Sequence, residues 1–284
     1  MTTTNAETTR PEHTRGDVLV EPEWLEAHLG EPNLRVIEVD VSPVAYDEGH
    51  ITGAHLWNIY RDLKTADYHF VGDSAIEALL GRSGVAPDST VVFYGYAPAM
   101  GFWLMKLYGH ADVRILNCSR QTWQTQSRAW TTDAAPPAGA RYPRLAQDAR
   151  LRADSSRVRD AIDNPTCTIV DVRSDAEFRG ERFWPSGGLE EGGRAGHIPS
   201  AQHVPIDHLQ DDDGRFRNPA QLREQFASID LTGNSELITY CTIGGRACTA
   251  WFALTYLLGR DHISVYDGSW AEWGRTPDLP VHTT

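Results

Sequence analysis

The fold is decided by the stretch ELITYCTIGGRA, residues 236–247. Its first five residues form a short apolar run, which predicts a buried strand that ends at a turn. The Gly-rich turn leads into residues 247–258, a segment long enough for a helix, and Gly259 suits the left-handed position after a last helical turn. Cys241 is therefore expected at the end of a strand, on a loop that opens into a helix.

This position favours a reactive cysteine. Loop N–H groups that converge on one point form an anion site, and the N-terminus of the following helix adds partial positive charge. Both effects favour the thiolate, which is the nucleophilic form of the side chain. The alternative is that Cys241 packs as a small buried hydrophobic residue, but the loop around it favours the nucleophile.

Two motifs carry a family resemblance. Residues 241–246, Cys-Thr-Ile-Gly-Gly-Arg, resemble the active-site loop of the rhodanese sulfurtransferases, typically Cys-Arg-x-Gly-x-Arg, and residues 268–273 resemble the rhodanese turn Gly-Ser-Trp-x-Glu-Trp. The resemblance covers residues 17–278. It implies a sulfurtransferase in which Cys241 carries sulfur as a persulfide, without a metal or organic cofactor. It also implies a small donor such as thiosulfate and an acceptor such as cyanide, a thiol or a sulfur-carrier protein.

The second half of the chain repeats the first. Gly-His-Ile occurs at 49–51 and again at 196–198, an offset of 147, and Tyr94 and Tyr240 are separated by 146. The strand at 168–173 is matched with the strand that ends at Asp40, and Asp171 is matched with Asp40. Two copies of one α/β unit are expected, each a mostly parallel sheet covered by helices on both faces, with ligands at the carboxyl ends of the strands. In family terms, these are two tandem rhodanese-like domains.

Composition suggests the domain boundaries. Residues 1–16 are polar and Thr-rich and predict a disordered tail. Residues 131–149 are rich in Ala, Pro and Gly and predict a linker between a first domain at 17–130 and a catalytic domain at 150–284. The first domain has Gly95 in the place of Cys241, so we expect it to be non-catalytic and to form a wall of the pocket.

Loop length separates two chemistries. Arg246 lies five positions after Cys241, and a phosphatase loop needs one more residue to surround a phosphate group. Sulfur transfer is therefore favoured over phosphate-ester hydrolysis. A non-catalytic sulfur-binding domain is a further alternative, and the intact loop argues against it.

The resemblance suggests that Arg173 holds an anionic donor, because it ends an Asp-x-Arg motif after a strand. A guanidinium group suits a sulfonate or a carboxylate. The alternative is a surface salt bridge between Arg173 and Asp175 or Glu177. Arg182 is a second candidate, because it begins an extra Gly-rich stretch, residues 182–194, that the first half lacks. The alternative is that this stretch is a surface loop with no role in donor binding.

The loop itself completes the expected donor site, which comprises Thr242, Ile243, Gly244, Gly245 and Arg246. Arg246 either binds the donor or pins the loop to a carboxylate such as that of Glu177. Many thiosulfate-using members have Arg directly after the nucleophile, where this chain has Thr242. The loss of that charge keeps 3-mercaptopyruvate open as the donor.

Charge and cysteine content restrict the partners. The net charge of −13 argues against nucleic acid and anionic membranes, and no apolar run reaches membrane-spanning length. Cysteines at 118, 167, 241 and 248 form neither a disulfide framework nor a zinc pattern, so a cytoplasmic location is expected. Cys248 is expected to pack in the helix; the alternative is a resolving thiol. The 11 histidines show no metal-ligand spacing.

Overall fold

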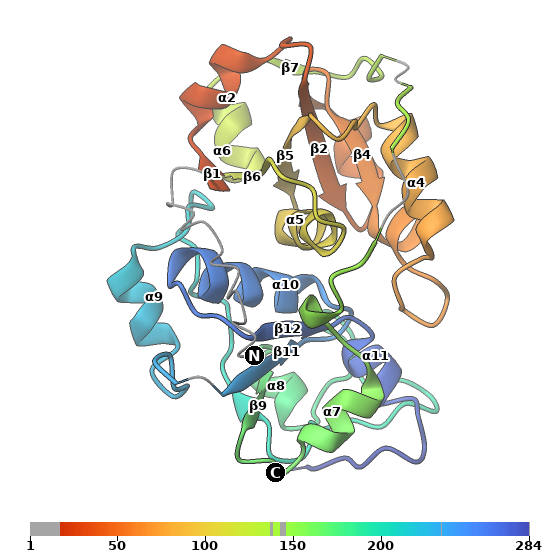
Figure 1. The fold of residues 1–284 in the computed structure, drawn as a ribbon, viewed down its shortest axis with the longest axis vertical. Helices are drawn as coiled ribbons and strands as arrows, with labels where there is room; N and C mark the ends of the chain where they lie inside the picture. Colours follow the sequence, from red (N-terminus) through yellow and green to blue (C-terminus); the bar gives the residue numbers. More distant parts are fainter. Residues whose placement is uncertain (1–17, 137–138, 143–145, 234, 284) are drawn as a thin grey trace, which may run out of the picture.

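The computed structural model describes residues 18–136, 139–142, 146–233 and 235–283. The expected tail and parts of the expected linker (137–138 and 143–145) lie outside these residues. The described chain forms two α/β units, one above the other in Figure 1, each built on a five-stranded sheet. Every strand pair within these two sheets is parallel. The predicted fold class is confirmed.

The first unit has the strand order β1-β6-β5-β2-β4. Its strands are β1 Leu19–Val20, β2 Leu34–Asp40, β4 His55–Asn58, β5 Thr90–Gly95 and β6 Val113–Leu116. Helices α4 (Asp73–Arg82) and α5 (Pro98–Leu107) cover one face, and α2 (Pro22–His28) and α6 (Arg120–Thr125) cover the other. The remaining elements are α3 (Val44–Asp47), the π-helix η1 (Ile59–Leu63) and an antiparallel pair of β3 (His50–Ile51) and β7 (Trp130–Thr131).

The second unit repeats this plan with the order β10-β9-β11-β12-β8. Its strands are β8 Arg152–Ala153, β9 Cys167–Asp171, β10 Gln202–His203, β11 Glu236–Tyr240 and β12 Ile263–Tyr266. Helices α9 (Pro219–Gln225) and α10 (Gly245–Phe252) cover one face, and α7 (Ser155–Ala161) and α11 (Ser269–Trp273) cover the other. Short helices η2 (Ala149–Leu151) and α8 (Asp175–Phe178) complete the unit.

The helix after the cysteine loop differs slightly from the prediction. It begins at Gly245, two residues before the expected start, and after Phe252 it widens into the π-helix η3 (Ala253–Leu257). Gly259 adopts φ +72°, the predicted left-handed conformation.

The repeat is confirmed at its tyrosines, but one expected match is wrong. The hydroxyl oxygens of Tyr94 and Tyr240 each accept a hydrogen bond from a backbone N–H at 3.1 Å, in corresponding places. Tyr94 lies opposite Glu38 and Tyr240 lies opposite Asp171 in the sheets, so the counterpart of Asp171 is Glu38 rather than Asp40. The reason is strand length, because β2 continues for two residues beyond this point whereas β9 ends there.

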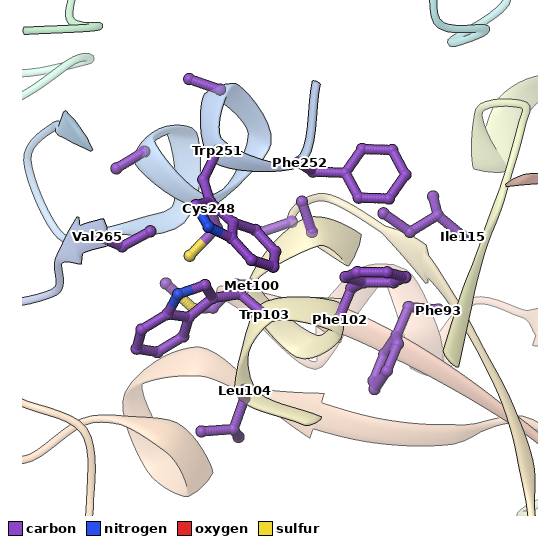
Figure 2. Packing of buried hydrophobic residues seen from close by; sticks show 14 of the residues in the cluster. Phe93, Met100, Phe102, Trp103, Leu104, Ile115, Cys248, Trp251, Phe252 and Val265 are labelled. Atoms are coloured by element: carbon purple, nitrogen blue, oxygen red, sulfur yellow. The ribbon is translucent and has the colours of Figure 1, made fainter. Parts of the chain in front are cut away.

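The two units share one hydrophobic core. Helix α5 of the first unit packs against α10 of the second, with Cys248, Trp251 and Phe252 facing Met100, Phe102 and Trp103 (Figure 2). The Phe102 ring lies 4.8 Å from that of Phe252 and 5.0 Å from that of Tyr256, both in edge-on contact. Burial raises the pKa of Cys248 well above its ordinary value, so this thiol stays protonated within the packing.

Candidate active site

Cys241 follows directly on β11, and its side chain is only 1% exposed. Its Sγ accepts a hydrogen bond from the backbone N–H of Gly244 at 3.1 Å. Gly244 adopts φ +94°, and a Cβ there would lie 3.2 Å from the carbonyl oxygen of Asp267. The loop therefore turns back on the sulfur at a position that strongly favours glycine.

The loop is fixed to the start of α11. The N–H of Cys241 donates to Ser269 Oγ at 3.2 Å, and the carbonyl oxygens of Cys241 and Thr242 accept from the N–H groups of Trp270 and Ala271, both at 2.9 Å. The sequence identifies this Gly-Ser-Trp segment through the family resemblance but does not predict its role. The contacts give it one, because it anchors the backbone that carries the nucleophile.

Glu177 ties the loop to α8. Its buried carboxylate accepts hydrogen bonds from both terminal nitrogens of Arg246, at 2.7 and 2.8 Å, and from Thr242 Oγ1 at 2.7 Å. Burial raises the pKa of Glu177, but the bonds and charge of Arg246, together with the hydroxyls of Thr242 and Ser174, lower it to about 2. Glu177 is thus a carboxylate that neutralises Arg246. Of the two roles considered for Arg246, pinning the loop is the one that these contacts provide.

Arg173 is fully buried beside the loop. Its guanidinium group donates to both oxygens of Asp171, at 2.6–3.1 Å, and to the carbonyl of Gly196 at 2.7 Å. It also lies over the Trp270 ring at 4.5 Å. The expected alternatives, Asp175 and Glu177, are not its partners. Its role in donor binding stays a prediction, because the side chain presents no solvent-exposed surface.

Arg182 is exposed, and its Nη1 donates to the carbonyl of Pro185 at 3.2 Å. The stretch that it begins reaches the first unit, because the ring of Trp184 packs 5.6 Å from that of Tyr68. Arg275 lies over the Tyr68 ring at 4.7 Å and holds Glu190 at 2.7 Å. The extra stretch therefore closes one side of the interface between the units. Donor binding by Arg182 stays a prediction.

The part of the first unit that faces the cysteine loop is the start of helix α5, which the sequence could not predict. A Cβ on Gly245 would lie 3.6 Å from that of Ala97, so the start of α5 faces the cysteine loop. Tyr96, beside it, is 65% exposed. Burial raises the pKa of Tyr96, and the charges that act on it include those of Arg246 and Cys241. Tyr96 is thus an exposed residue close to the charged groups of the site. Ile243 is half-buried against the shared core.

Within the described ranges, no three His, Cys, Asp or Glu side chains lie close enough to hold a metal ion. No helix in this part of the chain is both long and apolar enough to cross a membrane. All four cysteines are free thiols.

Residues 21–126 and 154–276 each match the Rhodanese-like domain. The chain belongs to the rhodanese family. Among its rhodanese relatives, the sulfur carrier protein TtuD of Thermus thermophilus is 36% identical over 274 residues, covering 93% of this chain and 96% of the relative. A Mycobacterium bovis protein named "Putative thiosulfate sulfurtransferase SseA" is 38% identical over 272 residues, covering 93% and 90%. This rhodanese-family chain is therefore a sulfurtransferase or a sulfur carrier.

Solved structures agree with the rhodanese fold. The anaerobic ergothioneine biosynthesis enzyme of Chlorobium limicola, solved with trimethyl histidine, superposes with a TM-score of 0.81 at 23% identity. The match covers 94% of this chain and 70% of the enzyme. At this identity the likeness concerns the fold alone.

Proposed function

We propose that this protein is a thiosulfate sulfurtransferase that works through a persulfide on Cys241. The observation that carries the proposal is the hydrogen bond from the Gly244 N–H to Cys241 Sγ at 3.1 Å, on a loop held by Glu177 and Arg246. An N–H aimed at sulfur stabilises an anion there before and after transfer. The names of the relatives support the same class of reaction.

The reaction is a double displacement. The Cys241 thiolate attacks the outer sulfur of thiosulfate, a new S–S bond forms, and the S–S bond of the donor breaks with its electron pair leaving on sulfite. The enzyme then carries a persulfide anion. An acceptor nucleophile, such as cyanide, a thiol or a sulfur-carrier protein, takes the terminal sulfur and regenerates the Cys241 thiolate. Each step conserves charge and requires no metal or cofactor.

A second donor, 3-mercaptopyruvate, is favoured by a specific observation. Arg246 is paired with Glu177, and the Thr242 hydroxyl, where many members carry Arg, is engaged by both of these side chains. The loop therefore offers little unmatched positive charge to a dianion. With mercaptopyruvate, the C–S bond breaks and the electron pair leaves on the pyruvate enolate, which then takes a proton.

The deciding measurement is the intact mass of the protein after brief exposure to thiosulfate and, separately, to 3-mercaptopyruvate. We expect a gain of one sulfur atom from thiosulfate, lost in Cys241→Ser and kept in Cys167→Ser, a matched control on β9. A gain from mercaptopyruvate alone would transfer the assignment to that donor. No gain from either donor would reject the persulfide mechanism, and an aryl phosphate would then test the phosphatase alternative.

A further inference from the structure

A turn of the first unit reaches under the cysteine loop of the second. Lys64 and Phe70 face each other across this turn in an antiparallel bridge. The N–H of Phe70 donates to Oδ2 of Asp267 at 3.0 Å, and Lys64 Nζ donates to the carbonyl of Asp267 at 2.8 Å. Asp267 directly follows β12, beside the loop.

The second unit makes the reciprocal contact. Gln210 and Phe216 form the same antiparallel bridge, and the N–H of Phe216 donates to Oδ1 of Asn117 at 3.0 Å, just after β6. The offsets are 146 from turn to turn and 150 between the acceptors, close to the 146 and 147 found for the repeat. The two contacts differ in charge, because Gln210 and Asn117 are neutral. Only the contact next to the cysteine joins a bridge Lys to an Asp acceptor.

The Lys64 ammonium is not fully compensated by Asp267. Its side chain is 0% exposed, and Nζ lies 3.8 Å from Oδ2 of Asp267 and 4.0 Å from the centre of the Phe70 ring. Arg152 already binds both oxygens of that carboxylate, at 2.9 and 3.2 Å. Burial lowers the pKa of Lys64, whereas the charge of Asp267 opposes this effect. Two cations thus share one carboxylate, and a buried positive charge is left over.

This charge lies directly behind the cysteine loop. Lys64 Nζ lies 3.5 Å from the position that a Cβ on Gly244 would occupy, and the Gly244 N–H contacts Cys241 Sγ at 3.1 Å. These separations and the width of one residue place Nζ within about 10 Å of Sγ. At that distance and an effective dielectric of about 20, a unit charge changes a thiol–thiolate equilibrium roughly tenfold.

We propose that Lys64 is a positioning residue for sulfur transfer, whose ammonium group, supplied by the non-catalytic unit, stabilises the anionic sulfur of Cys241. The thiolate part of this proposal stands on the geometry alone, and the persulfide part rests on the proposed function. The site on the second unit is then electrostatically incomplete without the first. This gives a physical reason for a unit without a nucleophile to stay attached.

The other charged groups around the sulfur are matched locally. Arg246 is paired with Glu177, and Arg173 with Asp171, while Tyr96 is an exposed titratable neighbour. The neighbouring thiol of Cys248 is held protonated by burial. All of these groups remain in the variants below, so changes in Cys241 reactivity report on Lys64.

The test is the pH dependence of Cys241 alkylation by iodoacetamide in the full chain, followed by intact mass, with Cys241→Ser as the blank. Lys64→Met removes the charge and keeps an apolar stem against Phe70. We expect its alkylation midpoint to move to higher pH by about one unit, with a rate roughly tenfold lower at pH 7. Gln210→Met, the same change in the matching turn, should leave the midpoint at the wild-type value.

Two further variants separate charge from packing. Lys64→Arg should keep the midpoint, and Asp267→Asn should move it to lower pH because a competing anion is lost. Asn is sterically plausible there, since Asn117 makes the equivalent bond in the first unit. The Asp267→Asn result also tests the proposal if Lys64→Met does not fold. An unchanged midpoint in Lys64→Met, or a shift in Asp267→Asn to higher pH, would overturn it.

Alkylation requires no sulfur donor, so this experiment is independent of the proposed function. A midpoint that moves with Lys64 in a protein that gains no sulfur would reject sulfur transfer and keep the electrostatic role. If the protein gains sulfur from thiosulfate but the alkylation midpoint of Lys64→Met is unchanged, sulfur transfer is kept and the electrostatic role of Lys64 is rejected.

Discussion

Glu177 connects helix α8 to two residues of the cysteine loop. It belongs to the capping box of α8, in which Ser174 Oγ accepts from the Glu177 N–H and the carboxylate accepts from the Ser174 N–H. The same carboxylate holds Thr242 and Arg246. One local sequence signal, Ser followed three residues later by Glu, therefore places the anion that shapes the nucleophile's loop.

Replacing this carboxylate should change how stability depends on pH. Because the pKa of Glu177 falls from 4.5 to about 2 on folding, the carboxylate stabilises the fold fully above about pH 4.5, and this contribution is lost as the pH falls toward 2. The contribution is about 3 kcal/mol. We expect urea unfolding of Glu177→Gln to show lower stability at pH 7 and a flatter decline between pH 5 and 3.

Asp175→Asn is the matched control on the same short helix. Its carboxylate is largely exposed and lies 3.8 Å from Arg179, so its loss should change stability by less than about 0.5 kcal/mol at either pH. Equal slopes for Glu177→Gln and the wild type would show that Glu177 does not titrate as the structure requires.

At the scale of elements, sequence patterns predicted what depends on local order. Apolar runs predicted the strand at 236–240 and the strand that ends at Asp40, and glycine predicted the left-handed end at Gly259. The burial of Arg173 was not predictable, because Gly196 and Trp270, which contact it together with the nearby Asp171, come from segments that meet only in the folded unit. The sequence also does not predict strand lengths, and for this reason Asp171 was matched with Asp40 in place of Glu38.

Two glycines at opposite ends of one helical segment test the loop geometry. Gly244 and Gly259 both adopt positive φ, so an alanine should destabilise either site by about 1 kcal/mol. Only at Gly244 is the space taken, by the carbonyl of Asp267 at 3.2 Å, whereas a Cβ at Gly259 meets nothing within 4 Å. We expect Gly244→Ala alone to slow Cys241 alkylation at pH 7 several-fold. Equal alkylation rates in the two variants would show that the Gly244 N–H does not determine sulfur reactivity.

At the scale of the whole molecule, the units are joined by more than a linker. One hydrophobic cluster runs from the first sheet through α5 and α10 to the second sheet, and the two reciprocal turns flank it. The repeat in the sequence predicts two copies of one unit, but it does not predict this contact between them. Its key residues, Lys64 and Asp267, are 203 positions apart. Asp267 directly precedes the Gly-Ser-Trp motif, but Lys64 lies in none of the motifs identified from the sequence.

The shared core predicts that both units unfold together. Phe102→Ala removes the ring contacts with Phe252 and Tyr256, which should cost about 3–5 kcal/mol. Cys118, buried in the outer core of the first unit, and Cys248, buried between the units, are natural probes of labelling in urea. Because half of a single core cannot unfold without exposing the other half to water, both thiols should be labelled at one urea midpoint, and the variant should lower that midpoint equally for both.

Val44→Ala, at an exposed site, should leave the midpoint unchanged. Labelling of Cys248 at lower urea than Cys118 would instead mean that the units separate before they unfold, and the Lys64 charge would then be lost from the site at that first step.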